Sequence, residues 1–167
     1  RKVCVWGPTD ANCAAFQKDL SEKGWQVQIM DSPAGVAAHA SFIVTTTPSK
    51  EPLLSAGDIR PGTHITAMGS DTPEKQDLDP AILAQAEILV ADSLSQCRTR
   101  GEISQALSRG IIPEGKAVEL GRVIQDPGRV NRLPDSISVA DLTGVAVQDI
   151  QIAQAVCALL ENGKKGE

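Results

Sequence analysis

Short apolar segments rich in β-branched residues alternate with helix-forming segments along this 167-residue chain. The connections between them are only a few residues long, so consecutive strands are expected to run parallel and to be joined by right-handed crossovers. The strands are too apolar to face water, which favours helices on both faces of the sheet. The pattern predicts an α/β fold, a Rossmann-like doubly wound parallel sheet. The expected strands are residues 2–6, 25–30, 41–47, 63–68, 87–91 and 136–142.

The helical segments are marked by apolar spacing and by capping residues. We expect a helix to begin at Pro80 with Asp79 as its cap, and Ser32 and Pro33 to open another. Glycines follow several of the segments and are expected to end them. The expected helices are residues 10–23, 31–40, 80–86, 93–108 and 146–160, with a short helix or turn at 118–124.

Composition limits the possible partners and the compartment. The net charge is −5 and no basic stripe is present, which argues against nucleic acid as a partner. No apolar run is long enough to cross a bilayer, so no membrane partner is expected. The four cysteines match no zinc pattern, and only two histidines are available, so no metal site is expected. Buried, reduced cysteines in a cytoplasmic protein are the favoured interpretation of Cys4, Cys13, Cys97 and Cys157.

An acidic residue follows directly after one of the expected strands. Residues 63–68 read as a strand that stops at Gly69, and Asp71 comes immediately beyond it. Ligands of open α/β sheets bind outside the carboxyl ends of the strands, which makes Asp71 a candidate for proton transfer or substrate binding. Asp also commonly bonds its own turn. From this segment alone the two interpretations are evenly balanced.

No glycine-rich phosphate turn follows any of the expected strands. The chain enters a strand directly after Arg1, and we therefore expect the first Rossmann strand and its glycine turn to lie before this sequence. Residues 2–6 would then be the second strand, whose tip lies beside the adenosine ribose in such domains. Here that tip is Gly7, Pro8 and Thr9. An ordinary strand-to-helix turn capped by Thr9 or Asp10 is the alternative.

Four stretches of the chain occur in an order typical of one family. They are Val-Trp-Gly at 5–7, residues 43–54, residues 60–79 and residues 141–149, with shorter matches at 96–97, 101–102 and 119–121. Together they span nearly the whole chain, and they resemble the ornithine cyclodeaminase and mu-crystallin family. That family also contains alanine dehydrogenases and ketimine reductases.

The resemblance implies a domain arrangement. Residues 1–145 would form part of an NAD(P)-binding Rossmann-type domain. Residues 146–167 would form a C-terminal helix that returns toward an N-terminal domain absent from this sequence. That domain would carry the substrate-binding lysine and arginine and would form a homodimer. Residues 1–167 alone are therefore expected to be inactive.

The resemblance also implies roles for individual residues. Asp71 matches the position of the family's catalytic acid, which the mu-crystallin type lacks, and Lys75 is expected to be a solvated surface lysine. The expected cofactor-binding residues are Gly7, Thr9, Thr45, Thr47, Met68, Gly69, Thr143 and Gly144. Many NADP-using members of the family carry an arginine, which would hold the ribose 2′-phosphate, where this chain has Pro8. The expected cofactor is therefore NAD, with NADP possible.

The function implied is that of an NAD(P)-dependent, ornithine cyclodeaminase-like amino or imino acid oxidoreductase or deaminase. Its substrate would be a small amino acid or a cyclic imine. The alternative is a non-catalytic, mu-crystallin-like protein that binds a nucleotide or another small ligand. The presence of Asp71 favours the enzyme.

Overall fold

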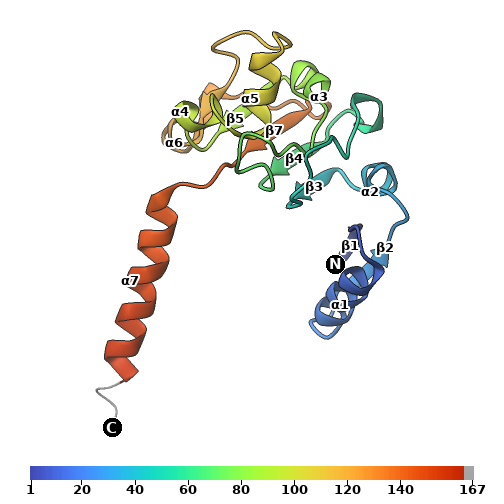
Figure 1. Ribbon diagram of the computed structural model, residues 1–167, viewed down its shortest axis with the longest axis vertical. Coiled ribbons are helices and arrows are strands. Elements are labelled where there is room, and N and C mark those ends of the chain that lie inside the picture. Colours follow the sequence, from blue (N-terminus) through green and yellow to red (C-terminus); the bar gives the residue numbers. More distant parts are fainter. Residues whose placement is uncertain (164–167) are drawn as a thin grey trace.

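The computed structural model describes residues 1–163, in which strands and helices alternate as expected (Figure 1). The last four residues of the expected range 146–167 lie outside the described residues. The strands are β1 (Lys2–Val5), β2 (Gln26–Ile29), β3 (Phe42–Thr45), β4 (His64–Ala67), β5 (Ile88–Ala91), β6 (Val118–Glu119) and β7 (Ser138–Asp141). The helices are α1 (Asp10–Ser21), α2 (Pro33–His39), α3 (Pro80–Gln85), α4 (Leu94–Cys97), α5 (Gly101–Ser108), α6 (Leu120–Gln125) and α7 (Ala146–Gly163), with short 3-10 turns η1 (Ala56–Asp58) and η2 (Pro127–Arg129).

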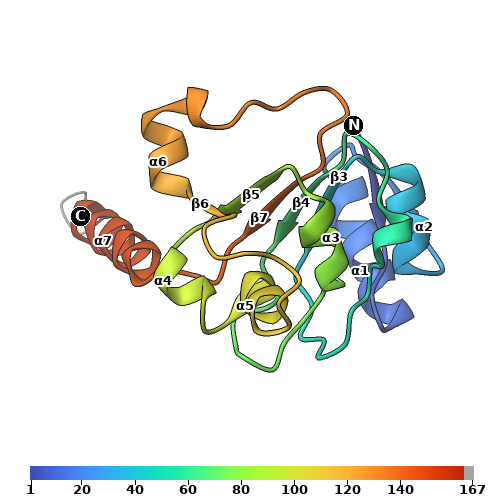
Figure 2. The same cartoon turned by 90° about the horizontal axis from the view of Figure 1, so that it is seen from above.

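Five strands form a parallel sheet in the order β3-β4-β7-β5-β6. The α/β, Rossmann-like fold expected from the sequence is thus confirmed. β1 and β2 form a separate parallel pair beside the β3 side of this sheet (Figure 2). The Rossmann strand order has one further strand between the positions that β1 and β3 occupy. The sheet is interrupted at that position.

The hydrophobic core lies on one face of the five-stranded sheet, where α3 and α5 pack against each other and α5 against β7. Ile65, Val139 and Leu89 point into it from three adjacent strands. Residues of β3 alternate: Ile43 and Thr45 are buried, whereas Phe42 is 63% exposed. The expectation that 41–47 is covered on both faces was therefore wrong, because nothing in the described part of the chain covers the outer face of β3.

The expected single helix over 93–108 is two helices, α4 and α5. Gly101 begins α5 with φ +87°, and a Cβ there would lie 2.6 Å from Oδ2 of Asp141. That same oxygen accepts the N–H of Ile103 at 2.8 Å and so caps the new helix. The carboxylate at the end of β7 is therefore the reason that α4 does not continue. The 118–124 segment was also only partly predicted, since Val118 and Glu119 form β6, which pairs with β5 before α6 begins.

Several local expectations are confirmed. The Ser32 hydroxyl accepts the N–H of Gly35 at the start of α2, and Asp79 accepts that of Ala81 at the start of α3. All four cysteines are free, and Cys13 and Cys97 are buried as expected, but Cys4 is only partly buried and Cys157, which lies on α7, is exposed. That helix extends away from the sheet (Figure 1), and its apolar side chains face solvent in the described structure, including Val147, Ile150, Ile152, Val156, Leu159 and Leu160. Among residues 1–163, no helix is both long and apolar enough to cross a membrane.

Candidate functional site

The candidate residues all follow the carboxyl ends of parallel strands. Thr45 ends β3, with Thr47 two residues beyond it, and Met68 and Gly69 follow β4. Thr143 and Gly144 follow β7. Because β3, β4 and β7 are neighbours in the sheet, the segments that leave their carboxyl ends, called exits below, lie side by side. This edge of the sheet is where an open α/β fold places its ligand.

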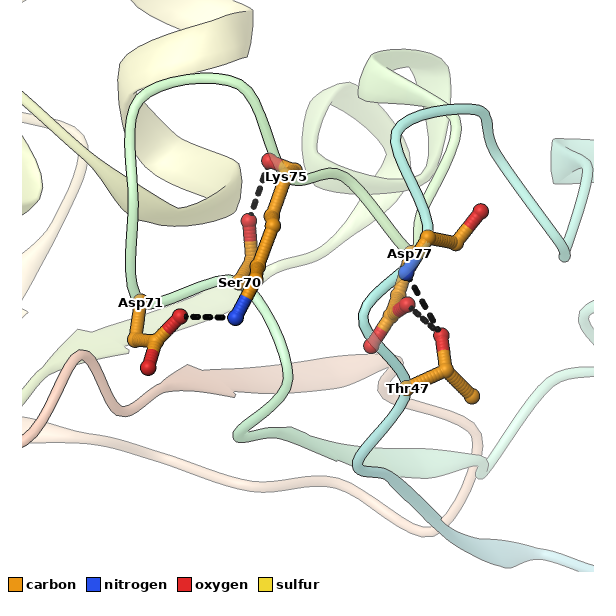
Figure 3. Close-up of polar contacts among 6 residues, drawn as sticks. Thr47, Ser70, Asp71, Lys75 and Asp77 are labelled. Carbon is orange, nitrogen blue, oxygen red and sulfur yellow. Dashed lines mark hydrogen bonds and ion pairs between the residues drawn. The ribbon is translucent and has the colours of Figure 1, made fainter.

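The loop after β4 carries Asp71 and is closed by Lys75 (Figure 3). The Nζ of Lys75 lies 2.6 Å from Oδ1 of Asp71, and the Ser70 hydroxyl donates to the Lys75 carbonyl. The Asp71 side chain is 53% exposed. The hydrogen bond from Lys75 is the main cause that lowers the pKa of Asp71. The expectation of a purely solvated Lys75 was therefore wrong: it is the ion-pair partner of the candidate acid.

The exits of β3 and β4 meet at Gly69. A Cβ at this position would overlap the backbone of Thr47 and a carboxylate oxygen of Asp77. The Thr47 hydroxyl donates a hydrogen bond to the other oxygen of Asp77 (Figure 3), which is fully buried. Only glycine allows the two strands and this carboxylate to approach so closely. Thr45 is also buried here, and its hydroxyl has no partner among the described residues.

The exit of β7 is held by Asp92, which follows β5. Its Oδ2 accepts the N–H of Gly144 at 2.8 Å, and its Oδ1 accepts the Thr143 hydroxyl at 3.2 Å. Thr143 and Gly144 line an open hollow of about 400 Å³ at the start of α7, together with Arg100. The Arg100 guanidinium also contributes to the lowered pKa of Asp71.

Gly7 and Thr9 lie apart from this cluster. They follow β1, which belongs to the separate two-stranded pair, and Thr9 precedes α1 without a side-chain cap bond. Thr9 is exposed. Within residues 1–163 the structure does not bring these two positions together with the residues after β3, β4 and β7.

Sequence reasoning missed several acids as members of this region: Asp77, Asp92, Glu102 and Asp141. Burial raises the pKa of Glu102, and the N–H groups of Asp77 and Leu78, which bond the ionised side chain, oppose the rise. Burial likewise raises the pKa of Asp141 to about 7. Asp92 and Asp141 could have been found by the reasoning that singled out Asp71, because each stands at the carboxyl end of a strand. Asp77 and Glu102 lie in stretches that resemble the family, but nothing in the local sequence assigns either of them a role.

Comparison with known proteins identifies the family. The model of the ornithine cyclodeaminase/mu-crystallin family matches residues 1–164. The chain belongs to this family. Its recognition from the ordered motifs is thus confirmed.

The relatives include enzymes of amino and imino acid chemistry. The alanine dehydrogenase of Archaeoglobus fulgidus is 41% identical over 125 residues, covering 74% of this chain and 38% of that protein. The iminosuccinate reductase of Paracoccus denitrificans is 36% identical over 163 residues, 96% of this chain and 49% of the relative. The chain therefore spans half or less of the length of these family members.

Solved structures show the same fold with a nucleotide. The Paracoccus iminosuccinate reductase in complex with NAD⁺ superimposes with a TM-score of 0.87 at 36% identity, covering 98% of this chain and 50% of that chain. The Δ¹-pyrroline-2-carboxylate reductase of Thermococcus litoralis, in complex with NADH and L-proline, gives 0.89 at 25% identity, covering 98% and 51%. The family's structures that resemble this chain thus include complexes with both oxidation states of NAD.

Proposed function

We propose that the protein is an NAD(P)-dependent amino or imino acid oxidoreductase or deaminase, and that Asp71 transfers protons in its reaction. The supporting observation is the half-exposed Asp71 carboxylate on the loop after β4, paired with Lys75 at the ligand-binding edge of the sheet. The relatives act on amino or imino acids, as their names state. The choice between reductase, dehydrogenase and cyclodeaminase is part of the experiment below.

The residues after β3, β4 and β7 fit the nicotinamide half of the cofactor. The buried hydroxyl of Thr45, which has no partner among the described residues, is suited to bond a ribose or carboxamide group. Thr47 and Gly69 form the adjoining surface, with Met68 beside them 51% exposed. On the other side, Thr143 and Gly144 line the hollow held by Asp92. When bound, the cofactor would supply a hydride acceptor or donor at this edge.

Asp71 has the properties that this chemistry needs. The side chain is a carboxylate at neutral pH, since its ordinary pKa is 3.8 and the Lys75 hydrogen bond lowers it further. A carboxylate can accept a proton from the substrate ammonium, which frees the amine before hydride leaves its carbon. Once that proton has passed to solvent, the carboxylate stabilises the positive charge of the resulting iminium and can accept a proton from the attacking water. In the reductive direction, the carboxylate would pass a proton taken up from solvent to the substrate nitrogen.

A mu-crystallin-like binding protein with little turnover is the second candidate. It would use the same nucleotide edge but would need no acid on the loop after β4. The ion pair of Asp71 with Lys75 and its proximity to Arg100 favour the enzyme, because a solvated turn aspartate would need neither cation.

We propose a preference for NAD over NADP. Pro8 follows β1 and has no charge with which to hold a 2′-phosphate, and Thr9 beside it is neutral. Titration of the full-length protein with NADH and with NADPH tests this preference: the NADPH dissociation constant should be the larger of the two. Equal or tighter binding of NADPH would contradict it.

We also propose that residues 1–145 form the nucleotide-binding part and that α7 packs against another domain of the same polypeptide. The 18-residue helix presents apolar side chains on several sides, and no described residue covers Ile152 or Leu159, which are 68% and 72% exposed. The iminosuccinate reductase that matches this chain is about twice as long, so it has enough residues for a further domain. A homodimer formed through that domain follows the archaeal alanine dehydrogenase, whose structure is described as a dimer.

The test is an activity panel with the full-length protein. Wild type, Asp71→Asn and the control Asp126→Asn are assayed with ornithine, alanine, cyclic imines and iminosuccinate, with both cofactors. Asp126 is a suitable control because it is an exposed aspartate paired with Arg129 elsewhere on the surface. Asp71→Asn should lower turnover on the best substrate by about 100-fold or more, with Asp126→Asn unchanged. Tight NADH binding with no turnover on any substrate would support the binding protein instead.

A further inference from the structure

Polar side chains along one face of α5 hold the loop that carries Asp71. Glu102, Gln105 and Arg109 are spaced three and four residues apart, so they lie on the same side of the helix. Glu102 is fully buried, at 1% exposure. Its Oε1 accepts the N–H of Asp77 at 2.7 Å, and its Oε2 accepts that of Leu78 at 3.1 Å. One side chain thus fixes two consecutive peptide groups at the end of the loop.

The other two side chains contact the middle of the loop. The amide nitrogen of Gln105 donates to the carbonyl of Pro73 at 2.8 Å. The Arg109 guanidinium donates to Oε1 of Gln76 at 3.0 Å. These two contacts are more exposed than those of Glu102, so each contributes less.

The helix that provides these contacts is itself fixed to the sheet. Asp141 ends β7 and accepts the N–H of Ile103 in the first turn of α5. Gly101 lies against the same carboxylate, where a Cβ would not fit. The position of Glu102 is therefore set by the central strand of the five-stranded sheet rather than by the loop it holds.

The loop links the backbone groups that Glu102 holds to the side chain of Asp71. Its end at Asp77 is joined to the exit of β3 through the Thr47 hydroxyl, and Lys75 stands two residues before Asp77 (Figure 3). Lys75 in turn binds Asp71 and accepts the Ser70 hydroxyl at its carbonyl. If residues 77 and 78 move, Lys75 moves with them, and its ion pair with Asp71 weakens.

We infer that Glu102 is a positioning residue that keeps the Asp71–Lys75 pair in place by holding the N–H groups of residues 77 and 78. The inference rests on the proposed role of Asp71. Glutamate is suited to this task because its ionised form offers two acceptor oxygens to two backbone donors, and these donors oppose the rise in pKa that burial causes. Glutamine has the same volume but offers one oxygen and one NH₂ group, so one N–H of the loop loses its acceptor.

The experiment compares full-length wild type with Glu102→Gln, Gln105→Ala and the control Glu114→Gln. Glu114 is an exposed glutamate that pairs with Arg98 and makes no contact with the loop among the described residues. Two measurements are made on each: amide hydrogen exchange of a peptide spanning 70–79, and the pH dependence of kcat. Cofactor dissociation constants are measured in parallel.

Glu102→Gln should speed amide exchange at 77 and 78 by about 10-fold or more, as expected for a locally opened segment. It should lower kcat by about 10- to 100-fold through misplacement of Asp71, with NADH affinity within about twofold of wild type. The acidic limb of the kcat profile should move to higher pH, because the lowered pKa of Asp71 depends on Lys75. Gln105→Ala should change exchange and kcat in the same direction by smaller factors, and Glu114→Gln should change neither.

Three outcomes overturn the inference. One is a folded Glu102→Gln variant whose loop exchanges at the wild-type rate. Another is faster exchange without any movement of the acidic limb. If Glu102→Gln does not fold, Gln105→Ala decides, and unchanged exchange and kcat in that variant overturn the inference. Full activity of Asp71→Asn would instead contradict the proposed function, and the exchange data would still report whether Glu102 holds the loop.

Discussion

Lys75 and Asp71 form an ion pair of 2.6 Å within one loop, and this pair lowers the pKa of the candidate acid. Lys75→Met removes the hydrogen bond that lowers the pKa of Asp71. The carboxylate is lost as the pH falls through that pKa, so the acidic limb of the kcat/KM profile should move to higher pH in the variant. A pH–rate series on the full-length protein measures this.

The control for that series is Arg129→Met, which breaks a comparable surface pair with Asp126. Its profile should match that of wild type. An acidic limb that stays in place in Lys75→Met would show that the titrating group is not Asp71.

Gly69 should tolerate no side chain. In Gly69→Ala the new Cβ would overlap the Thr47 backbone and the buried Asp77 carboxylate, so the exits of β3 and β4 must separate. We expect a loss of about 1–3 kcal/mol in the free energy of unfolding, together with weaker NADH binding. Urea denaturation and fluorescence titration measure the two effects.

Gly121→Ala is the matched control, because nothing lies within 4 Å of a Cβ built there and the residue is in α6. Alanine there should leave the free energy of unfolding unchanged or raise it by up to about 1 kcal/mol. Equal stability of the two variants would contradict the close approach described for Gly69.

The buried Asp141 makes stability depend on pH. Its pKa is raised to about 7, above the ordinary value of 3.8, so its contribution to stability is fully present below the ordinary pKa. That contribution falls by about 1.4 kcal/mol per pH unit as the pH rises from the ordinary pKa of 3.8 toward about 7, above which it is lost. Asp141→Asn should flatten this part of the curve between pH 5 and 7. Parallel curves for wild type and variant would exclude Asp141 as the cause.

The β1–β2 pair should be the least protected part of the sheet in residues 1–167 alone. It has two strands, and an isolated two-stranded unit is marginal in water. Amides of 26–29 should exchange about 100-fold or more faster than those of Ile65 and Val139, which are fully buried in the central strands. Hydrogen exchange measured on residues 1–167 checks this, and similar rates in both places would contradict it.

The strand and helix order could be predicted because each element carries its own signal: β-branched runs for β3 and β4, and Asp79-Pro80 for the start of α3. The break between α4 and α5 could not, because its cause is Asp141, which is distant in sequence. The exposed outer face of β3 was missed for a similar reason. An apolar run shows that both faces of a strand can be buried, but it does not show which part of the protein covers them.

Within the candidate site, Asp71 could be singled out because it follows a strand that ends at Gly69. Its link to Lys75 was missed because a lysine in a polar loop is usually solvated. The role of Glu102 could not be read from the sequence, since it depends on α5 packing beside the loop. Sequence patterns indicated the candidate acid, whereas the contacts that fix its loop are visible only in the tertiary structure.

The most direct test of the account is a single-turnover measurement of hydride transfer in the full-length protein. NADH-loaded wild type, Asp71→Asn and Asp126→Asn are mixed with the best imine substrate, and the decay of NADH absorbance is followed. The account predicts that Asp71→Asn slows this decay by about 100-fold or more while NADH binding is retained, and that Asp126→Asn behaves as wild type. Hydride transfer at the wild-type rate in Asp71→Asn would contradict it.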